Sequence, residues 1–330
     1  MNYRDNVYGT VSITEPVLLD LIASSAMQRL KGVQQHGISG LIGITQPISR
    51  FEHSLGAMLL VRQLGAALKE QIAAMLHDVS HTAFSHVIDY VFDGHDSQSY
   101  HDEKKAEYMA QTDLPGLLAG HGYNWHDFVH EDDFSLLEQP APRLCADRLD
   151  YFLRDSQELG LAATADIRIV LEHLVVAEGR IATDKLEVAQ WLGYTYIEAD
   201  DASWSNFREV GIYELTAQAL KIALDKGAIT EADFWRTDQP VWDSLQAHPD
   251  PQLQAALQWV SPQTQFVWDD INPTFYVGTK IRSIDPDVVV AGACRPLSAL
   301  DPDFAHHRAN YHRRKEGKWP MRVVGLEASS

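Results

Sequence analysis

Apolar residues recur at helical spacing over most of the chain. Val17, Leu18, Leu21 and Ile22 show this spacing in the first such segment, and they predict a helix over residues 15–25. Similar patterns predict further helices over residues 25–33, 54–68, 71–79, 82–92, 101–110, 143–159, 186–199 and 202–224. A polar stretch at residues 93–100 predicts a turn. The chain is therefore expected to be mainly α-helical.

Short runs of β-branched and aromatic residues predict a few strands. Residues 169–182 are expected to form a small hairpin that turns at Gly179. Further strands are expected over residues 265–268, 280–284 and 288–290, followed by a helix that begins at Asp301. The basic run 313–315 on that helix is typical of a solvated helix face, with phosphate binding as the alternative.

These changes of pattern suggest three regions along the chain. A helical core is expected over residues 1–160, a helical extension with the short hairpin over 161–263, and a small α+β region over 264–330. With 330 residues and 45% hydrophobic content, the chain can form one large domain, or a main domain with a smaller one.

Charge and cysteine content exclude several classes of protein. The net charge of −19 disfavours nucleic acids and anionic membranes as partners. Cys145 and Cys294 are the only cysteines, so neither a disulfide framework nor a cysteine metal cage is expected. The sequence shows no secretory signal and no apolar run of about 18 residues. We expect a cytoplasmic protein without a membrane partner, and a homo-oligomer is one option for its assembly.

The first candidate for chemistry is the pair His77-Asp78, which directly follows the apolar run 72–76. On a continuous helix, His81 would share a face with His77 because the two are four residues apart. Buried imidazoles and carboxylates need partners or a metal, and this ligand type suits Mn, Fe, Zn or Ni. Capping and hydrogen bonding are the alternative. A second pair, His126-Asp127, lies in an acidic stretch without an apolar helix and is expected to be solvated.

Two other segments supply possible partners for this pair. His53 is expected in the first turn of a helix with Arg50 just before it, and a cation beside a metal ligand suits a phosphate substrate. Asp147 begins a polar stripe on the predicted helix 143–159, continued by Asp150, Tyr151 and Arg154. If that stripe faces the histidines, Asp147 completes a set of ligands.

Together, these segments resemble the HD-domain phosphohydrolases, and within them the deoxynucleoside triphosphate triphosphohydrolase-like branch. The resemblance rests on the order, spacing and residue types of segments 50–56, 76–86 and 147–155, and it covers roughly the first half of the chain. It implies a helical HD fold that binds one divalent transition metal, Mn, Fe, Ni or Zn, through His53, His77, Asp78 and Asp147. Mg is a further candidate, bound together with the substrate phosphates.

The resemblance also implies roles in catalysis and substrate binding. His81 and His101 would assist the leaving oxygen or the attacking water, and His86 would be a further active-site histidine. The positions implied to contact substrate are Arg50, Arg148 and Tyr151 for phosphate and Gln35 for the sugar. His36, Ser80, Thr82 and Ala83 depart from the usual residues of the family, which leaves the ligands intact but can reshape the pocket.

The sequence thus predicts a metal-dependent phosphohydrolase acting on a nucleotide, first a deoxynucleoside triphosphate. A nucleoside monophosphate phosphatase or another HD phosphoesterase is the alternative within this class. A di-iron oxygenase would need His81, His86 and His101 to hold a second metal. A nucleotide-sensing protein would use the same site without turnover.

Overall fold

Helices carry most of the polypeptide in the computed structural model, which describes residues 1–92 and 98–326. The first half contains α1 (Pro16–Ala23), α2 (Ser25–Arg29), α3 (Gly37–Leu41), α4 (Arg50–Gln63), α5 (Leu68–Leu76), α6 (Val87–Val91), α7 (Tyr100–Ala110), α8 (Leu114–Gly120) and α9 (Ala146–Glu158). The second half adds α10 (Thr164–His173), α11 (Leu186–Ala199), α12 (Phe207–Asp225), α13 (Asp238–Ala247), α14 (Pro251–Leu257), α15 (Leu297–Leu300) and α16 (Pro302–Lys315). The mainly α class is confirmed. Positions 93–97 of the expected polar turn lie outside the described residues.

The strands form three small sheets. An N-terminal hairpin pairs β1 (Asn2–Asp5) with β2 (Gly9–Ser12). A four-stranded sheet has the order β3 (Leu174–Ala177), β4 (Arg180–Thr183), β7 (Asp287–Val290) and β8 (Ala293–Pro296). A three-stranded sheet places β9 (Trp319–Leu326) between β5 (Thr264–Trp268) and β6 (Phe275–Val277). The predicted turn at Gly179 is confirmed by the β3–β4 hairpin, where this glycine has a φ of 73°.

Two of the expected strand segments are not strands. Residues 169–171 belong to α10, where Ile167 and Val170 are buried at helical spacing. Residues 280–284 are irregular, and the N–H groups of Arg282 and of Asp285, the residue directly after this range, bond to other parts of the chain instead of a sheet. The N–H of Arg282 donates to Asp200 Oδ2 at 3.0 Å, and the N–H of Asp285 donates to the Pro142 carbonyl at 2.8 Å.

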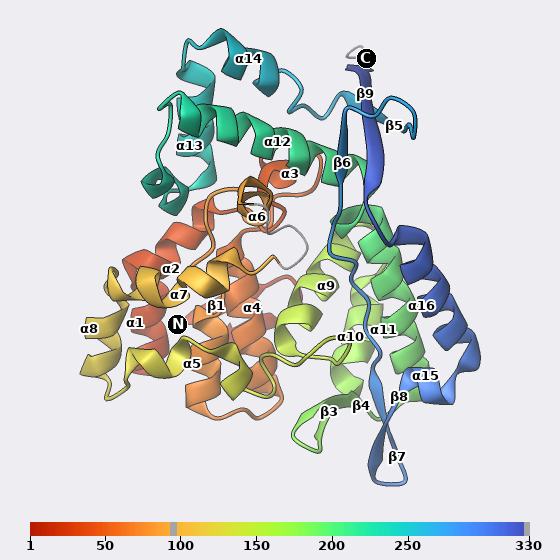
Figure 1. The fold of residues 1–330 in the computed structure, drawn as a ribbon. Helices are drawn as coiled ribbons and strands as arrows, with labels where there is room; N and C mark the ends of the chain where they lie inside the picture. Colours follow the sequence, from red (N-terminus) through yellow and green to blue (C-terminus); the bar gives the residue numbers. More distant parts are fainter. Residues whose placement is uncertain (93–97, 327–330) are drawn as a thin grey trace.

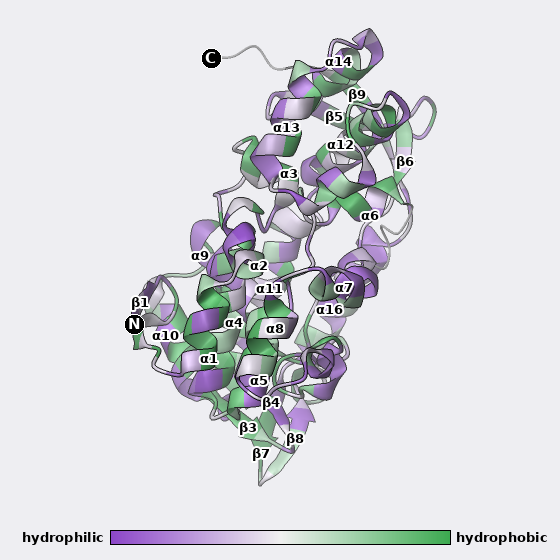
Figure 2. Cartoon of the chain, turned by 90° about the vertical axis from the view of Figure 1, so that its left-hand side faces the viewer, coloured by the Kyte–Doolittle hydropathy of each residue, from purple (hydrophilic) through white to green (hydrophobic). Residues whose placement is uncertain are grey.

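The helices pack around two main hydrophobic clusters. The first joins α1, α4, α5, α9 and α11, and the second surrounds α12 with α6, α13, α14 and the β5–β9–β6 sheet. Figure 1 shows the corresponding arrangement, with α12, α13 and α14 above the N-terminal helices. Hydrophilic and hydrophobic bands alternate on helices such as α1 and α5 (Figure 2), as expected where one face is buried. The first cluster includes residues from both sides of position 160, and the three-region division stays a prediction.

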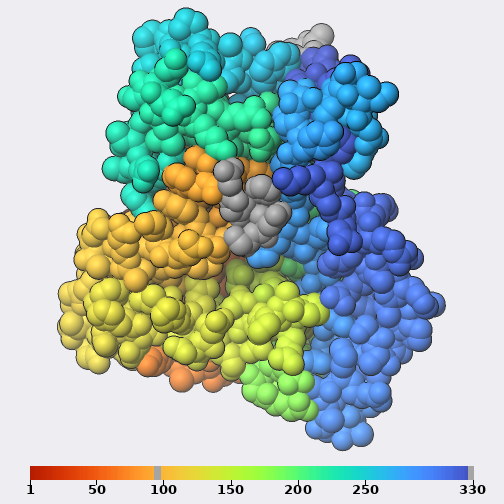
Figure 3. Space-filling view, in the orientation of Figure 1, coloured from red at the N-terminus to blue at the C-terminus, as the bar shows by residue number. Residues whose placement is uncertain are grey.

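One long connection brings the C-terminal part of the chain to the N-terminal helices. The segment 278–286 joins β6 to β7 and runs down the molecule past α9 and α11 (Figure 1). On the face shown in Figure 3, blue C-terminal residues lie beside yellow residues from the first half of the chain. Within the described part of the chain, no helix is long and apolar enough to cross a bilayer.

The contact between α4 and α9 leaves no room for a side chain at Gly56. A Cβ atom added to this glycine would lie 2.0 Å from both Asp150 Oδ1 and Arg154 Nη2. These two side chains form a buried ion pair, with Arg154 Nε 2.8 Å from Asp150 Oδ2. The guanidinium also reaches Asp5 at 2.9 Å, which ties the β1–β2 hairpin to α9.

We therefore expect Gly56→Ala to lower the free energy of unfolding by about 1–3 kcal/mol, because the methyl group must displace a buried ion pair. Gly116→Ala is the matched control, since this helical glycine on α8 is exposed with nothing within 4 Å of an added Cβ. Urea denaturation of both variants checks the prediction. Equal free energies of unfolding for the two variants would show that α4 and α9 can move apart without loss of stability.

Candidate metal centre and active site

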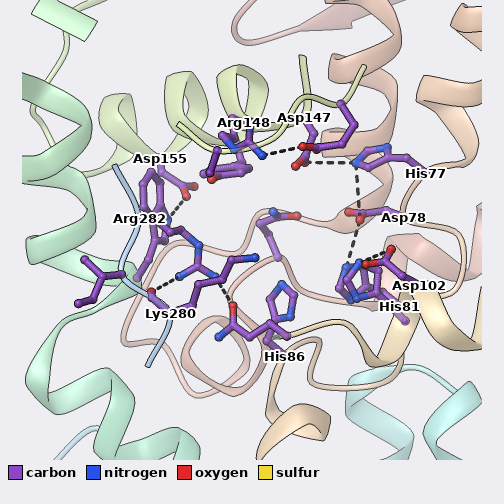
Figure 4. Close-up of a pocket in the computed structure, with 18 of the residues that line it drawn as sticks. His77, Asp78, His81, His86, Asp102, Asp147, Arg148, Asp155, Lys280 and Arg282 are labelled. Carbon is purple, nitrogen blue, oxygen red and sulfur yellow. Dashed lines mark hydrogen bonds and ion pairs between the residues drawn. The ribbon is translucent and has the colours of Figure 1, made fainter. Parts of the chain in front are cut away.

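A cavity of about 640 Å³ lies between the N-terminal helices and the segment 278–286. Its volume falls in the range of roughly 300–1,000 Å³ that is usual for small-molecule sites. One wall carries His77, Asp78 and Asp147, and Lys280 and Arg282 enter from the opposite side (Figure 4). The cavity thus joins residues far apart in the sequence.

Four side chains turn their ligand atoms toward one point on the first wall: His53, His77, Asp78 and Asp147, here called the four-residue group. The Nε2 atoms of His53 and His77 are 3.0 Å apart. Asp147 Oδ1 lies 3.0 Å from the first nitrogen and 3.4 Å from the second. Asp78 Oδ2 lies 3.6 Å from His53 Nε2, and its Oδ1 lies 3.6 Å from His77 Nε2.

Hydrogen bonds behind the two imidazoles fix which ring nitrogen faces the group. His53 Nδ1 lies 2.8 Å from Asp150 Oδ2, and His77 Nδ1 lies 2.7 Å from the Ala74 carbonyl oxygen. Both partners are acceptors, so each Nδ1 carries the proton and each neutral ring presents an Nε2 lone pair to the group. Two nitrogen lone pairs and two carboxylates then converge on one point, and none of these four groups supplies a proton donor there.

The electrostatics of the group favour a cation at this point. Burial alone would lower the pKa of His77, but Asp78 and Asp147 raise it to about 10. Burial likewise opposes a rise at His53, where hydrogen bonds to the Asp147 and Asp150 carboxylates nevertheless raise the pKa. The imidazoles therefore attract a proton strongly, and a divalent cation can take the place of that proton. Imidazole and carboxylate ligands suit Mn, Fe, Ni or Zn.

The local fold places the pair His77-Asp78 at the end of a buried helix. Helix α5 ends at Leu76, and residues 77–80 form a turn. The prediction that His77 and His81 share one helix face is therefore wrong. The turn still brings them to one carboxylate, because Asp78 Oδ1 lies 3.6 Å from His77 Nε2 and 3.1 Å from His81 Nε2.

Helix α4 positions His53 from the other side. Ser49 is its N-cap and forms a capping box with Glu52, so the helix begins at Arg50 and not at the expected position 53 or 54. His53 therefore lies one turn into the helix, buried against α9. From α9, Asp147 and Asp150 reach its two ring nitrogens, which confirms that the polar stripe faces the histidines.

Three further histidines, His81, His86 and His101, form a trio next to Asp78. The rings of His81 and His101 stack with centroids 3.8 Å apart, and the His86 ring lies 5.0 Å from the first and 5.5 Å from the second. Burial and the Arg50 charge lower the pKa of each ring against the opposing charge of Asp78, and they bring that of His81 to about 3. The trio is therefore neutral at physiological pH in the absence of a ligand.

A strained loop supports this trio. The expected helix over residues 82–92 begins only at Val87, after Phe84 and Ser85, whose φ angles are 63° and 50°. Such angles are costly for residues other than glycine. The Phe84 N–H donates to Asp238 Oδ1 at 2.8 Å, and Ser85 Oγ accepts a hydrogen bond from Arg50 Nε at 3.1 Å. These bonds hold the turn that leads to His86.

The two arginines implied to contact phosphate line the cavity, but both have acidic partners. Arg50 is buried, with Nη1 2.7 Å from Asp78 Oδ2. Arg148 Nη2 lies 2.6 Å from Glu138 Oε1. In this structure their charges are thus largely engaged.

The remaining substrate positions also line the cavity. The hydroxyl of Tyr151 bonds to that of Tyr196. The Gln35 carbonyl oxygen Oε1 is buried without a hydrogen-bond partner among the described residues, so it can accept a bond from a ligand. His126 and Asp127, expected to be solvated, are exposed.

Sequence reasoning missed several residues that line the cavity. Lys280 and Arg282 were placed in a strand, where no signal pointed to a site. His36 was noted only as a departure from the usual pattern, yet its Nε2 lies 3.0 Å from Asp155 Oδ1. Trp204 Nε1 donates to the other oxygen of this carboxylate at 2.7 Å. The one sequence signal for that pair is the unusual His at position 36, together with an Asp on the helix that becomes α9.

The comparisons with known proteins agree with this geometry. The HD domain family model matches residues 50–155. The metal-dependent phosphohydrolase cns2 of Cordyceps militaris is 38% identical over 93% of this chain and 91% of its own length. The uncharacterized protein YdhJ of Bacillus subtilis is 40% identical over 87% of this chain and 88% of its own. The matched segment contains the whole four-residue group.

A solved structure and a more distant group of relatives complete the comparison. The crystal structure of a hypothetical protein from Aquifex aeolicus has a TM-score of 0.71 and 18% identity, covering 98% of this chain and 96% of that chain, which shows a shared fold. A deoxynucleoside triphosphate triphosphohydrolase SAMHD1 homolog of Dictyostelium discoideum is 25% identical over 54% of this chain and 40% of its own length.

The His36–Asp155 pair predicts a pH dependence of stability. Burial alone would lower the pKa of His36, but Asp155 raises it above the usual value near 6.5. A raised pKa in the folded state means that protonation favours folding, so the contribution is full below about pH 6.5 and is lost as the pH rises through the folded-state pKa. We expect the stability advantage of wild type over His36→Gln to shrink across that window.

Urea denaturation of both proteins between pH 5.5 and 9 measures this difference. His126→Gln is the matched control for losing an imidazole, since His126 is exposed and its ring contacts the neutral side chains of Asn124 and Trp125. A stability difference that does not change with pH would mean that His36 does not form an ion pair.

Proposed function

Because the chain belongs to the HD-domain family of metal-dependent phosphohydrolases, we propose that it hydrolyses nucleotides, with deoxynucleoside triphosphates as the substrate class. The four-residue group beside the neutral histidine trio is the observation that carries this proposal. The nucleotide part is supported by the similarity to the deoxynucleoside triphosphate triphosphohydrolase of Dictyostelium and by a cavity of about 640 Å³.

We assign the metal to His53, His77, Asp78 and Asp147. Two imidazoles and two carboxylates leave further positions on the ion for substrate and water. When bound, a divalent transition metal supplies Lewis acidity to the phosphate and to the attacking water. Asp150 and the Ala74 carbonyl keep both Nε2 atoms aimed at the ion, which saves reorganisation on binding.

The histidine trio provides the proton transfers in this proposal. His81 and His101 are neutral, so their free nitrogens can accept a proton from the attacking water. A phosphate anion bound beside them raises the pKa of both rings, which brings them closer to the working pH. The protonated ring can then donate to the leaving oxygen. His86, edge-on to both rings, is assigned as the third active-site histidine.

Gln35, Arg50, Arg148 and Tyr151 are proposed to contact the substrate. Arg50 joins Asp78 to the strained turn at Ser85, so it can orient a phosphate oxygen next to the metal. Gln35 offers its unpaired Oε1 to a sugar hydroxyl.

Product analysis is the first test. The Mn-loaded protein is incubated with deoxynucleoside triphosphates, ribonucleoside triphosphates and nucleoside monophosphates, and products are separated by chromatography. We expect nucleoside and triphosphate from the first class, loss of activity with a chelator, and recovery after metal is added back. The double variant His77→Ala/Asp78→Ala is the inactive control.

If only the monophosphates react, giving nucleoside and inorganic phosphate, the protein is a nucleotidase and nucleoside monophosphates are its substrate class. No turnover by the metal-loaded protein would contradict a nucleotide hydrolase and favour a sensor of nucleotides.

Substitutions of a metal ligand and of a proton-transfer residue should have different effects on metal content and on activity. We expect His53→Ala to lose bound metal and activity together. His81→Ala should keep its metal and lower kcat by about 10²- to 10⁴-fold, because it removes a proton-transfer group and not a ligand. Metal content by mass spectrometry and kcat are measured on the same preparations. His121→Ala, on the surface beside Asp20, is the matched control.

The same experiment tests the one alternative that the geometry favours. Ligand atoms of Asp78, His81 and His101 lie within 4.8 Å of one another and could hold a second ion, as a di-iron oxygenase requires. Two metals per chain, with one lost in His81→Ala, would support that alternative. One metal per chain in both proteins excludes it.

A further inference from the structure

We propose that Lys280 and Arg282, on the segment 278–286, form the anion site that binds a phosphate group of the substrate. This assignment rests on the proposed function and adds a recognition element to it. Both residues lie outside the span matched by the HD domain model, which ends at residue 155. Part of the chemistry that binds phosphate would thus come from a different part of the chain than the chemistry that binds metal.

The backbone of this segment is fixed although it belongs to no sheet. The Arg282 N–H donates to Asp200 Oδ2, and this buried carboxylate also accepts from the hydroxyls of Ser205 at 2.9 Å and Tyr311 at 2.8 Å. Ser283 Oγ lies 2.9 Å from Arg308 Nε and 2.6 Å from His312 Nε2. The cations therefore sit on an anchored segment, which limits the entropy lost when a ligand binds.

The two cations have no acidic partners of their own. Arg282 Nη1 donates to the Lys280 carbonyl oxygen at 3.2 Å, and Nη2 donates to the amide oxygen of Gln98. Among residues 1–92 and 98–326, neither side chain forms an ion pair with a carboxylate. In contrast, Arg50 and Arg148 pair with Asp78 and Glu138. The positive charge available to a ligand is therefore concentrated at Lys280 and Arg282.

Both side chains point into the cavity and toward the metal-facing wall. Figure 4 shows them projecting between Asp155 and His86, opposite Asp78. Lys280 is exposed at the mouth of the cavity, and Arg282 is half-buried. Burial and the neighbouring Arg282 charge lower the pKa of Lys280, and the charge of Asp147 on the opposite wall opposes this shift. A ligand between the two walls would contact both the metal and the cations.

Phosphate is the ligand chemistry that fits this pair. A guanidinium can bond two phosphate oxygens at once, and an ammonium adds a second charge with freely rotating donors. Surface cations without acidic partners are common, but these two line a cavity whose opposite wall is acidic. In a protein of net charge −19, two unpaired cations facing inward would draw an anion to this place.

Single replacements by glutamine test the assignment on the metal-loaded protein. We expect Arg282→Gln and Lys280→Gln each to raise KM by about 10- to 100-fold, the usual effect of losing a charge-assisted hydrogen bond. The anchoring bond from the Arg282 N–H is kept in both variants. Arg295→Gln and Lys318→Gln, two exposed cations outside the cavity, are the matched controls with unchanged KM.

Binding of inorganic phosphate, pyrophosphate and tripolyphosphate, measured by calorimetry, makes the test independent of turnover. The metal contributes equally in wild type and variants, so any difference in affinity comes from the cations. At least tenfold weaker binding of one of these anions to both variants supports the site, even if no nucleotide is hydrolysed. Wild-type protein that binds none of the three anions, or variants that bind them as wild type does, would overturn it. An unchanged thermal melting temperature confirms that the variants are folded.

Discussion

Two imidazole nitrogens, 3.0 Å apart and both aimed inward by acceptors that bond the other nitrogen of each ring, meet two carboxylates in the interior of the protein. Such a cluster repels itself unless a cation lies within it. Three elements must hold it together: α4 carries His53, the turn after α5 carries the pair His77-Asp78, and α9 carries Asp147. The close approach of α4 to α9 at Gly56, and the buried Asp150–Arg154 ion pair beneath it, are the means by which the helices are kept in register.

Much of this arrangement could be predicted from the sequence, because it follows from local patterns. An apolar run before His77 and a polar stripe on the helix of Asp147 specify which residues face the core and which face one another. The helix ends were harder to predict. Ser49 caps α4 through Glu52, and the turn at 77–80 replaces the helical spacing expected of His77 and His81. In both cases a few hydrogen bonds outweigh the periodicity of the side chains.

The part of the cavity beyond the motif could not be predicted in the same way. Residues 280–284 have the composition of a strand, yet the N–H of Arg282 donates to Asp200 and that of Asp285, directly after this range, donates to the Pro142 carbonyl, both elsewhere in the chain. The His36–Asp155 contact joins positions 119 residues apart. Contacts of this kind depend on how the helices pack, which a single sequence does not reveal.

The anchored connection between β6 and β7 has a consequence for how such a protein can change over time. It is held by the bond from the Arg282 N–H to Asp200 and by the Ser283 side chain, which bonds to Arg308 and His312, so neither anchor uses the side chains at 280 and 282. The codons for these two cations also lie far from those for the histidine and aspartate motifs. A lineage could alter the charge on this wall of the cavity by changing a few codons while those motifs stay as they are.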